Sequence, residues 1–321
     1  MAFDVNQFYA DLDDFYGKYD NAATEQFLLD SLAKSEEYMI IPTSCSSCQD
    51  HSDHTPEENY ERLTDAEKKW ILECSDARIA VLNEMACFYR GTSNWNKCIS
   101  AFDAVIDELT IRGLEKTNQY AVVLLNEAGA FRLMGEFDKA LATFAKAEEI
   151  LTSNGDADPY ELAGLYNNTG LVYQDMGKLD KAIENFELAL DYLAKADDTE
   201  AEIATNSANL AIAYYSSGNL NKALDCLNRS IAIFEKLDDG MNPHYAGALN
   251  TKAVVLFNNG DFAGAAATFA DAAAKTKLIF GENKDYATLC RNTAYAYAKL
   301  GDNAQAAEYS AIADEVAKKI G

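Results

Sequence analysis

A glycine followed five residues later by an alanine recurs at a nearly constant interval along most of this chain. The pairs are Gly135/Ala140, Gly177/Ala182, Gly218/Ala223, Gly260/Ala265 and Gly301/Ala306. Successive alanines lie 42, 41, 42 and 41 residues apart, and Ser93/Cys98 extends the series upstream. A unit of this length is too short to bury a core alone. The fixed period therefore predicts a stack of repeated units, each packed on its neighbours.

The residues around this alanine, which we call the frame alanine, predict that each unit is a hairpin of two helices. The position twelve residues before it is always small, the position nine before it is large, and the position four after it is usually aromatic or aliphatic. Small residues let two helices approach closely, and the glycine suits the left-handed end of the first helix. In Leu179–Leu193, apolar residues at i, i+3, i+4 and i+7 predict a half-buried second helix.

This frame resembles the tetratricopeptide (TPR) repeat, and Thr169–Phe186 (TGLVYQDMGKLDKAIENF) matches its small–aromatic–glycine–alanine–aromatic order closely. The resemblance covers six repeats over residues 64–321. Their period exceeds the usual length of about 34 residues and is similar to that of kinesin-light-chain-type and bacterial peptide-binding TPR proteins. The resemblance implies an all-α fold, a right-handed superhelical solenoid of antiparallel helix hairpins.

The rest of the chain predicts two further segments. Residues 1–37 carry a shortened version of the frame and are expected to form an N-terminal helix hairpin, a degenerate repeat. Residues 38–63 break the pattern and are expected to form an inserted loop with a short helix. After this insert, Thr64–Glu67 (TDAE) has the form of a capping box and predicts the start of a long helix that reaches Tyr89.

The composition restricts the classes of partner. The chain of 321 residues has a formal net charge of −25, which disfavours nucleic acid because phosphates would be repelled. This acidity either attracts a basic partner or keeps a long helical array in solution. We expect no membrane span and no secretory signal, since no long apolar run is present. The seven cysteines are an odd number and indicate reduced thiols and a cytoplasmic protein.

The family resemblance also implies that the first helix of each hairpin lines a concave groove. Fourteen residues before the frame alanine, these helices carry Asn126, Asn168, Asn209, Thr251 and Asn292. Asparagine is a poor residue inside helices, so its repeated use suggests a task for the amide. A carboxamide can bond both the C=O and the N–H of an extended peptide, which predicts a peptide-binding groove. The alternative is that each asparagine bonds a neighbouring helix and only fixes the hairpin geometry.

Other groove positions follow from helical periodicity around these asparagines. They are Arg132, Asn167, Gln174, Asp175, Tyr215, Asn250, Phe257, Asn258, Arg291, Tyr295 and Lys299. Three of them are basic and one is acidic. This local excess predicts that the groove accepts a carboxylate, such as a peptide C-terminus near Arg291 and Lys299. The alternative is that these cations are only solvated residues at the rim of the groove.

The inserted loop contains four residues that could bind a metal ion, namely Cys45, Cys48, His51 and His54. Zinc takes four such ligands in a tetrahedron, and C-x-x-C forms a good half-site. The four residues are only three apart, however, which leaves little chain to wrap around one ion. A zinc site, a redox pair of cysteines and a plain solvated loop all remain open.

No catalytic arrangement and no glycine-rich phosphate loop is recognisable, so we expect a non-enzymatic scaffold. The leading prediction is that the protein holds an extended peptide, or the tail of a protein partner, in its concave groove. One alternative is a bacterial regulatory receptor for a pheromone-type peptide. Another is a structural assembly subunit that forms homo-oligomers through its end hairpins, because Ile312, Val316 and Ile320 form an apolar stripe on the C-terminal helix.

Overall fold

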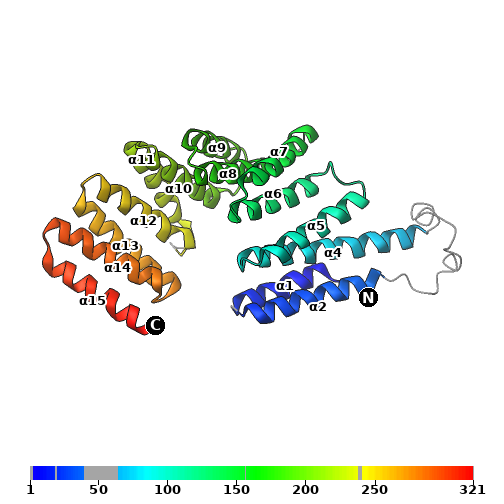
Figure 1. The fold of residues 1–321 in the computed structure, drawn as a ribbon, viewed down its shortest axis with the longest axis horizontal. Helices are drawn as coiled ribbons and strands as arrows, with labels where there is room; N and C mark the ends of the chain where they lie inside the picture. Colours follow the sequence, from blue (N-terminus) through cyan, green and yellow to red (C-terminus); the bar gives the residue numbers. More distant parts are fainter. Residues whose placement is uncertain (1–2, 19, 40–63, 156, 238–240, 321) are drawn as a thin grey trace. The chain divides into compact units, whose positions relative to one another are not determined.

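The computed structural model describes residues 3–18, 20–39, 64–155, 157–237 and 241–320, and all regular structure in these ranges is helical (Figure 1). The fourteen described helices follow one another as hairpins. This confirms the predicted all-α architecture of packed helix hairpins. The chain divides into two compact units, Met1–Gly155 and Asp156–Gly321.

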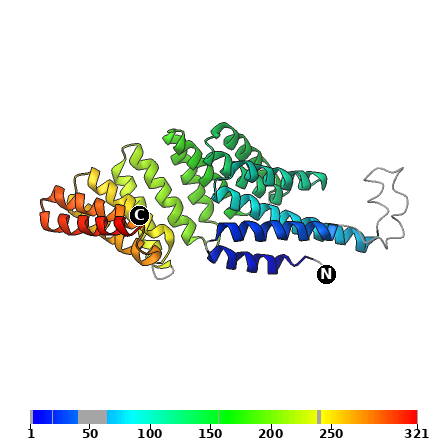
Figure 2. The same cartoon turned by 60° about the horizontal axis from the view of Figure 1, so that its bottom comes forward.

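The first unit contains six described helices. They are α1 (Val5–Gly17), α2 (Asn21–Met39), α4 (Asp65–Gly91), α5 (Trp95–Ile111), α6 (Asn118–Leu133) and α7 (Phe137–Asn154). Helix α4 begins at Asp65, as the TDAE sequence predicted. Helix α2 packs along α4 (Figure 2). The carboxylate of Glu25 on α2 reinforces this contact, because it accepts hydrogen bonds from the hydroxyl of Tyr89 at 3.0 Å and from Lys97 Nζ at 2.6 Å.

The described residues of the second unit contain eight α-helices arranged as four hairpins. They are α8 (Pro159–Asp175), α9 (Leu179–Leu193), α10 (Glu200–Ser216), α11 (Leu220–Phe234), α12 (Pro243–Asn258), α13 (Phe262–Phe280), α14 (Lys284–Leu300) and α15 (Asn303–Ile320). Helix α9 has the bounds that the periodicity predicted. Helix α10 contacts both α8 and α12 directly, so the first helices form one layer of the unit (Figure 1).

The glycines of the frame end the first helices in the left-handed conformation. Their φ angles are 78° at Gly135, 71° at Gly177, 82° at Gly218, 83° at Gly260 and 87° at Gly301. The N–H of the next residue then reaches back to the carbonyl of the large frame residue, as Lys178 does to Tyr173 at 2.8 Å. This is the bond of a Schellman turn. Ser93 takes the glycine's place in one turn and has a φ of 56°.

The remaining frame positions form the core between the helices. Ala140, Ala182, Ala223 and Ala265 are fully buried, with 0% of their surface exposed. The aromatic or aliphatic residues four positions later are buried too, among them Phe144, Phe186, Leu227 and Phe269. The frame therefore marks the residues through which the two helices of a hairpin touch. Burial of these apolar side chains is the main term that stabilises each hairpin.

A lysine directly before the frame alanine covers the large ring of the same hairpin. The ammonium nitrogens of Lys97, Lys139, Lys181 and Lys222 lie 5.1, 5.5, 5.2 and 4.7 Å from the centroids of Tyr89, Phe131, Tyr173 and Tyr214. Such cation–π contacts contribute about 0.5–1 kcal/mol at exposed sites. Gly264 and Gln305 replace the lysine in the last two hairpins, so this contact is missing there.

The apolar stripe predicted on the C-terminal helix is mostly used inside the second unit. Val316 is buried, and Ile312 packs against a core cluster that also contains Phe269. Ile320 is 48% exposed. Two of the three side chains therefore stabilise the unit itself.

The predicted metal ligands Cys45, Cys48, His51 and His54 lie outside the described residues. Within the described ranges, no group of three His, Cys, Asp or Glu side chains is placed to hold a metal ion. No helix in these ranges is both long enough and apolar enough to span a membrane. Burial raises the pKa of the Cys98 thiol to about 11 and also raises that of Cys290, which suits packing rather than reactivity.

Candidate functional site

The asparagines that recur fourteen residues before the frame alanine all lie on first helices. Asn126 is on α6, Asn168 on α8, Asn209 on α10 and Asn292 on α14. All four are partly exposed. Their position on the partly accessible face of these helices is what a binding role requires, and it does not by itself show that role.

The hydrogen bonds of these side chains stay within the protein. Asn168 Nδ2 donates to the carbonyl of Gly164 in its own helix at 2.9 Å. Thr251, which takes the asparagine's place on α12, bonds Gly247 in the same way at 3.0 Å. Asn209 Nδ2 instead reaches the next helix and donates to Asn167 Oδ1 at 3.0 Å. Of these three bonds, only that of Asn209 reaches a neighbouring helix, as the geometric alternative expects, and contact with a peptide stays a prediction.

Side chains predicted for the groove connect the successive first helices of the second unit. The Asn209–Asn167 bond joins α10 to α8. Asn258 Nδ2 donates to the hydroxyl of Tyr215 at 2.6 Å and joins α12 to α10. The rings of Phe257 and Tyr295 stack with centroids 5.3 Å apart and join α12 to α14. We call these six residues (Asn167, Asn209, Tyr215, Phe257, Asn258 and Tyr295) the amide–aromatic strip.

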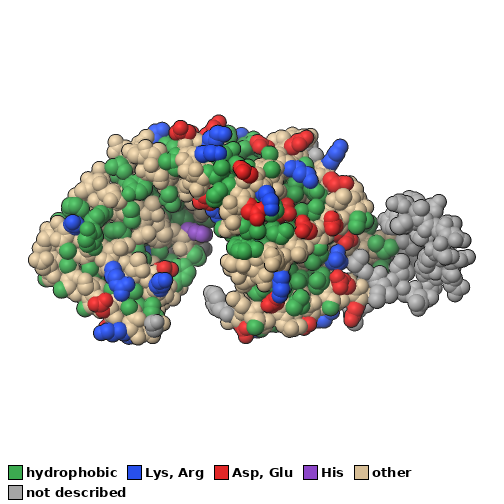
Figure 3. Space-filling model, in the orientation of Figure 1, with side chains coloured by type: hydrophobic (Ala, Val, Ile, Leu, Met, Phe, Trp, Pro, Cys, Tyr) green, Lys and Arg blue, Asp and Glu red, His purple; other side chains and the backbone are tan. Residues whose placement is uncertain are grey.

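The amide–aromatic strip contains no charged side chain, although the whole chain has a net charge of −25. The face of the second unit seen in Figure 3 likewise carries mainly hydrophobic and uncharged side chains, with charged groups scattered among them. Two further predicted groove residues hold buried acceptors without a hydrogen-bond partner, namely Gln174 Oε1 and Asn250 Oδ1. The first helices therefore offer amides and aromatic faces.

The cations predicted for the groove occupy two different places. Arg132 lies on α6 of the first unit and is partly exposed. Arg291 lies on α14 and approaches Asp314 of α15, with Nη2 3.8 Å from Oδ1. Lys299 lies over the ring of Tyr295, 5.3 Å from its centroid. Arg291 thus already faces a carboxylate of the protein, and binding of a ligand carboxylate there stays a prediction.

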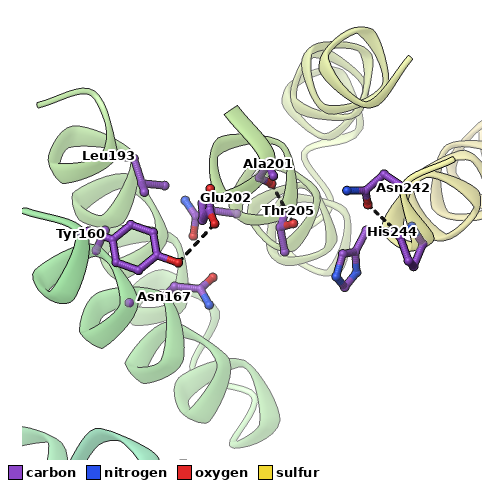
Figure 4. A pocket seen from close by; sticks show the side chains of 12 residues that line it. Tyr160, Asn167, Leu193, Ala201, Glu202, Thr205, Asn242 and His244 are labelled. Atoms are coloured by element: carbon purple, nitrogen blue, oxygen red, sulfur yellow. Dashed lines mark hydrogen bonds between the residues drawn. The ribbon is translucent and has the colours of Figure 1, made fainter. Parts of the chain in front are cut away.

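A pocket of about 460 Å³ opens beside the amide–aromatic strip, between the N-terminal halves of α8 and α10 and the start of α12 (Figure 4). Its lining residues are Tyr160, Ala163, Gly164, Asn167, Leu193, Ala201, Glu202, Thr205, Asn206, Asn242, Pro243 and His244. Asn167 belongs to both the pocket and the strip, so the two surfaces are continuous.

One side-chain contact across the pocket joins Tyr160 on α8 to Glu202 on α10. The tyrosine hydroxyl donates to Glu202 Oε1 at 3.2 Å, and the two side chains point toward each other in Figure 4. Burial, followed by the neighbouring Glu202, raises the pKa of Tyr160, so the phenol stays protonated and remains a donor at neutral pH. Our sequence analysis did not identify these two residues, because neither belongs to the recurring asparagine register.

The geometry so far defines a class of protein, a solenoid of helix hairpins whose first helices form a contact layer. Residues 161–236, which run from α8 to the end of α11, match the family model described as tetratricopeptide repeat. The chain therefore contains tetratricopeptide repeats. Repeats of this family are typically non-enzymatic scaffolds that bind other proteins. The predicted family is thereby confirmed.

Solved structures show the same fold. BtubC (BKLC) from P. vanneervenii is 21% identical over 77% of this chain and 92% of its own, with a TM-score of 0.56. A putative kinesin light chain from Podosopora anserina with nearly identical TPR-like repeats is 18% identical over 63% of this chain and 97% of its own, with a TM-score of 0.55. The apo form of RapI is 16% identical over 75% of this chain and 98% of its own, with a TM-score of 0.53. No curated protein matches the chain in sequence.

Proposed function

We propose that this protein is a non-enzymatic scaffold that holds an extended segment of a protein partner along the first helices of its second unit. The observation that carries the proposal is the amide–aromatic strip, which places uncharged hydrogen-bonding groups and ring faces on four successive first helices. The tetratricopeptide family supports the general role, because its members typically bind proteins.

An extended peptide suits this surface for a chemical reason. Its backbone presents N–H and C=O groups at regular spacing, and a carboxamide can bond to both. Phe257 and Tyr295 offer stacked rings against which apolar side chains of the peptide would pack. Recognition of this kind depends more on the backbone of the peptide than on its side chains.

The test compares two double variants of the full chain. Asn168→Ala with Asn209→Ala removes amides from the first helices α8 and α10. Asn185→Ala with Asn228→Ala removes the same number of amides from the second helices α9 and α11 and serves as the control. Each protein is immobilised and offered a mixture of acetylated, amidated hexapeptides of random sequence, and the retained peptides are quantified by mass spectrometry. The melting temperature of each variant is measured in parallel.

We expect the first-helix variant to retain at least about tenfold less peptide than wild type, as two lost hydrogen bonds of about 1 kcal/mol each would give. The control variant is expected to retain as much as wild type. If the first-helix variant melts at a lower temperature but keeps its peptides, the asparagines only fix the packing of the helices and the proposal is wrong. Equal loss in both variants contradicts it as well.

The charged groups at α14 allow a narrower form of the proposal, in which a peptide C-terminus lies near Arg291 and Lys299. Arg291 is exposed and stands 3.8 Å from Asp314, so a ligand carboxylate would compete with an existing partner. Peptides with a free C-terminus should then bind more tightly than their amides, and Arg291→Ala with Lys299→Ala should abolish the difference. Equal binding of acids and amides by wild type argues against this narrower form.

A further inference from the structure

One position of the core changes character in a single repeat. Seventeen residues before the frame alanine, the other first helices carry apolar residues that are 0–7% exposed, namely Val81, Val123, Leu165, Ala248 and Leu289. Helix α10 carries Asn206 there, and this asparagine is only 2% exposed. An amide at a position built for an apolar side chain is costly unless its polar atoms are paired. The presence of asparagine at this buried position therefore requires a separate explanation.

The hydrogen bond of Asn206 uses its side-chain nitrogen and leaves its side-chain oxygen without a partner. Its Nδ2 donates to the backbone carbonyl of Phe186 at 2.7 Å, which fixes the orientation of the amide. Its Oδ1 is buried and accepts no hydrogen bond. Asn206 is at the same time one of the residues that line the pocket between α8, α10 and α12. The pocket wall thus contains a buried acceptor that has no hydrogen-bond donor.

The other polar groups of the pocket favour a cationic donor. Glu202 contributes a carboxylate, and none of the lining residues is a lysine or an arginine. Tyr160 donates its hydroxyl hydrogen bond to Glu202, lines the cavity and is 49% exposed as a residue. A carboxylate, an unpaired amide oxygen and an aromatic face are three features that a guanidinium group can use together. It donates five N–H groups in one plane and stacks on rings.

We propose that this pocket receives the guanidinium group of an arginine side chain from the extended segment that the first helices hold. The planar group donates to Glu202 and to Asn206 Oδ1 and lies against the ring of Tyr160. Because Asn167 belongs to both the pocket and the amide–aromatic strip, the peptide backbone follows the strip while this one side chain enters the pocket. This inference rests on the proposed function and adds a side-chain preference to it.

The test again uses acetylated, amidated hexapeptides of random sequence, now in three mixtures whose central residue is fixed as arginine, lysine or citrulline. Citrulline keeps the shape of arginine and lacks its charge. Wild type, Glu202→Gln and Asn206→Leu are compared with Glu200→Gln, which removes the same charge from an exposed site on the same helix outside the pocket. All measurements are made at pH 8 and at two salt concentrations, since the acidic chain attracts any cation through its overall field.

Wild type is expected to retain arginine peptides at least about fivefold better than citrulline peptides, and better than lysine peptides. Glu202→Gln is expected to lose this preference, whereas Glu200→Gln keeps it. Asn206→Leu, which restores the apolar residue of the other repeats, is expected to fold at least as stably as wild type and to lose the preference for arginine over lysine.

The results separate this inference from the proposed function. Peptides retained without any preference at the central position leave the extended-segment proposal standing and overturn the guanidinium pocket. Equal retention of lysine and arginine overturns it too, because the site would then respond to charge alone. A preference for arginine that persists in Glu202→Gln also overturns the guanidinium pocket. No retention of any mixture by wild type contradicts both proposals.

Discussion

The ring of Phe186 on α9 lies directly against the backbone of Gly170 on α8. A Cβ built on Gly170 would stand 2.7 Å from Cε1 of this ring, well inside the contact distance of two carbon atoms. We expect Gly170→Ala to destabilise the protein by about 1–3 kcal/mol, because overpacking outweighs the gain of about 1 kcal/mol in helix propensity. Urea denaturation measures the change.

Gly164 on the same helix is the matched control for this substitution. A Cβ there would meet no atom within 4 Å, so Gly164→Ala is expected to raise the free energy of unfolding by about 0.5–1 kcal/mol. Two glycines of one helix should thus respond with opposite signs. Stabilisation of both variants would show that Phe186 moves aside freely and that the close approach has no structural consequence.

Ser93 occupies the left-handed position that glycine holds in the other hairpin turns. Its φ of 56° is unfavourable for a side chain with a Cβ. Ser93→Gly should therefore stabilise the protein by about 0.5–1 kcal/mol, measured as an increase in the denaturation midpoint at unchanged slope. Ser217, whose φ is −82°, is the control, since Ser217→Gly gains nothing from conformation and should destabilise slightly.

Glu127 on α6 makes the stability depend on pH. The side chain is 7% exposed, and its burial, followed by the charge of Asp103, raises its pKa from 4.5 to about 7, while Lys146 acts in the opposite direction. Between these two values the folded state binds more protons than the unfolded state, so stability falls as the pH rises through this window. At pH 8 the full penalty applies. At pH values below 4.5 the residue is protonated in both states and contributes no penalty.

We expect Glu127→Gln to stabilise the protein by about 2 kcal/mol at pH 8 and by much less at pH 5. Denaturation curves at several pH values between these limits give the dependence for each variant. The exposed Glu149, changed to glutamine, is the control for loss of one negative charge from an acidic chain. A gain that is the same at both pH values would mean that Glu127 does not titrate in this range.

The bond between Asn209 and Asn167 predicts an energetic coupling between α10 and α8. In a double-mutant cycle with alanine, the two substitutions should couple by about 0.5–1 kcal/mol in the free energy of unfolding. Asn167 and Asn292 lie on different helices, α8 and α14, and their substitutions should be additive within about 0.3–0.5 kcal/mol. Additivity in both cycles would remove the hydrogen bond as a structural link.

The fold could be predicted from the sequence because the same packing problem recurs at every hairpin. Each hairpin uses a glycine to end its first helix, a buried alanine and an aromatic or aliphatic residue, such as Gly177, Ala182 and Phe186. These residues recur with a period of about 42 residues, which is too regular to arise by chance. The covering lysines were equally visible, because Lys97, Lys139, Lys181 and Lys222 recur one residue before the frame position. Their contact with the rings was not predicted, because a single lysine is typical of a solvated helix face.

The candidate site could be predicted only in part. Helical periodicity selected a partly exposed face of the first helices, but the partner of each amide depends on a rotation of about 100° per residue and on the distance between helices. Asn168 and Asn167 are adjacent, yet the first bonds its own helix and the second accepts from α10. Asn206 left a different signal, which was the absence of an apolar residue at a position that is apolar elsewhere. A search for recurring polar residues overlooks such an exception.

The amide–aromatic strip is already hydrogen-bonded to itself when no partner is present. Under the proposed function, an incoming chain would break the Asn209–Asn167 and Asn258–Tyr215 bonds before it formed its own, so each exchanged hydrogen bond would contribute a net of only about 1 kcal/mol. Such an exchange would also remove the two links that join α10 to α8 and α12 to α10, so that binding of a segment and the packing of neighbouring first helices would be coupled.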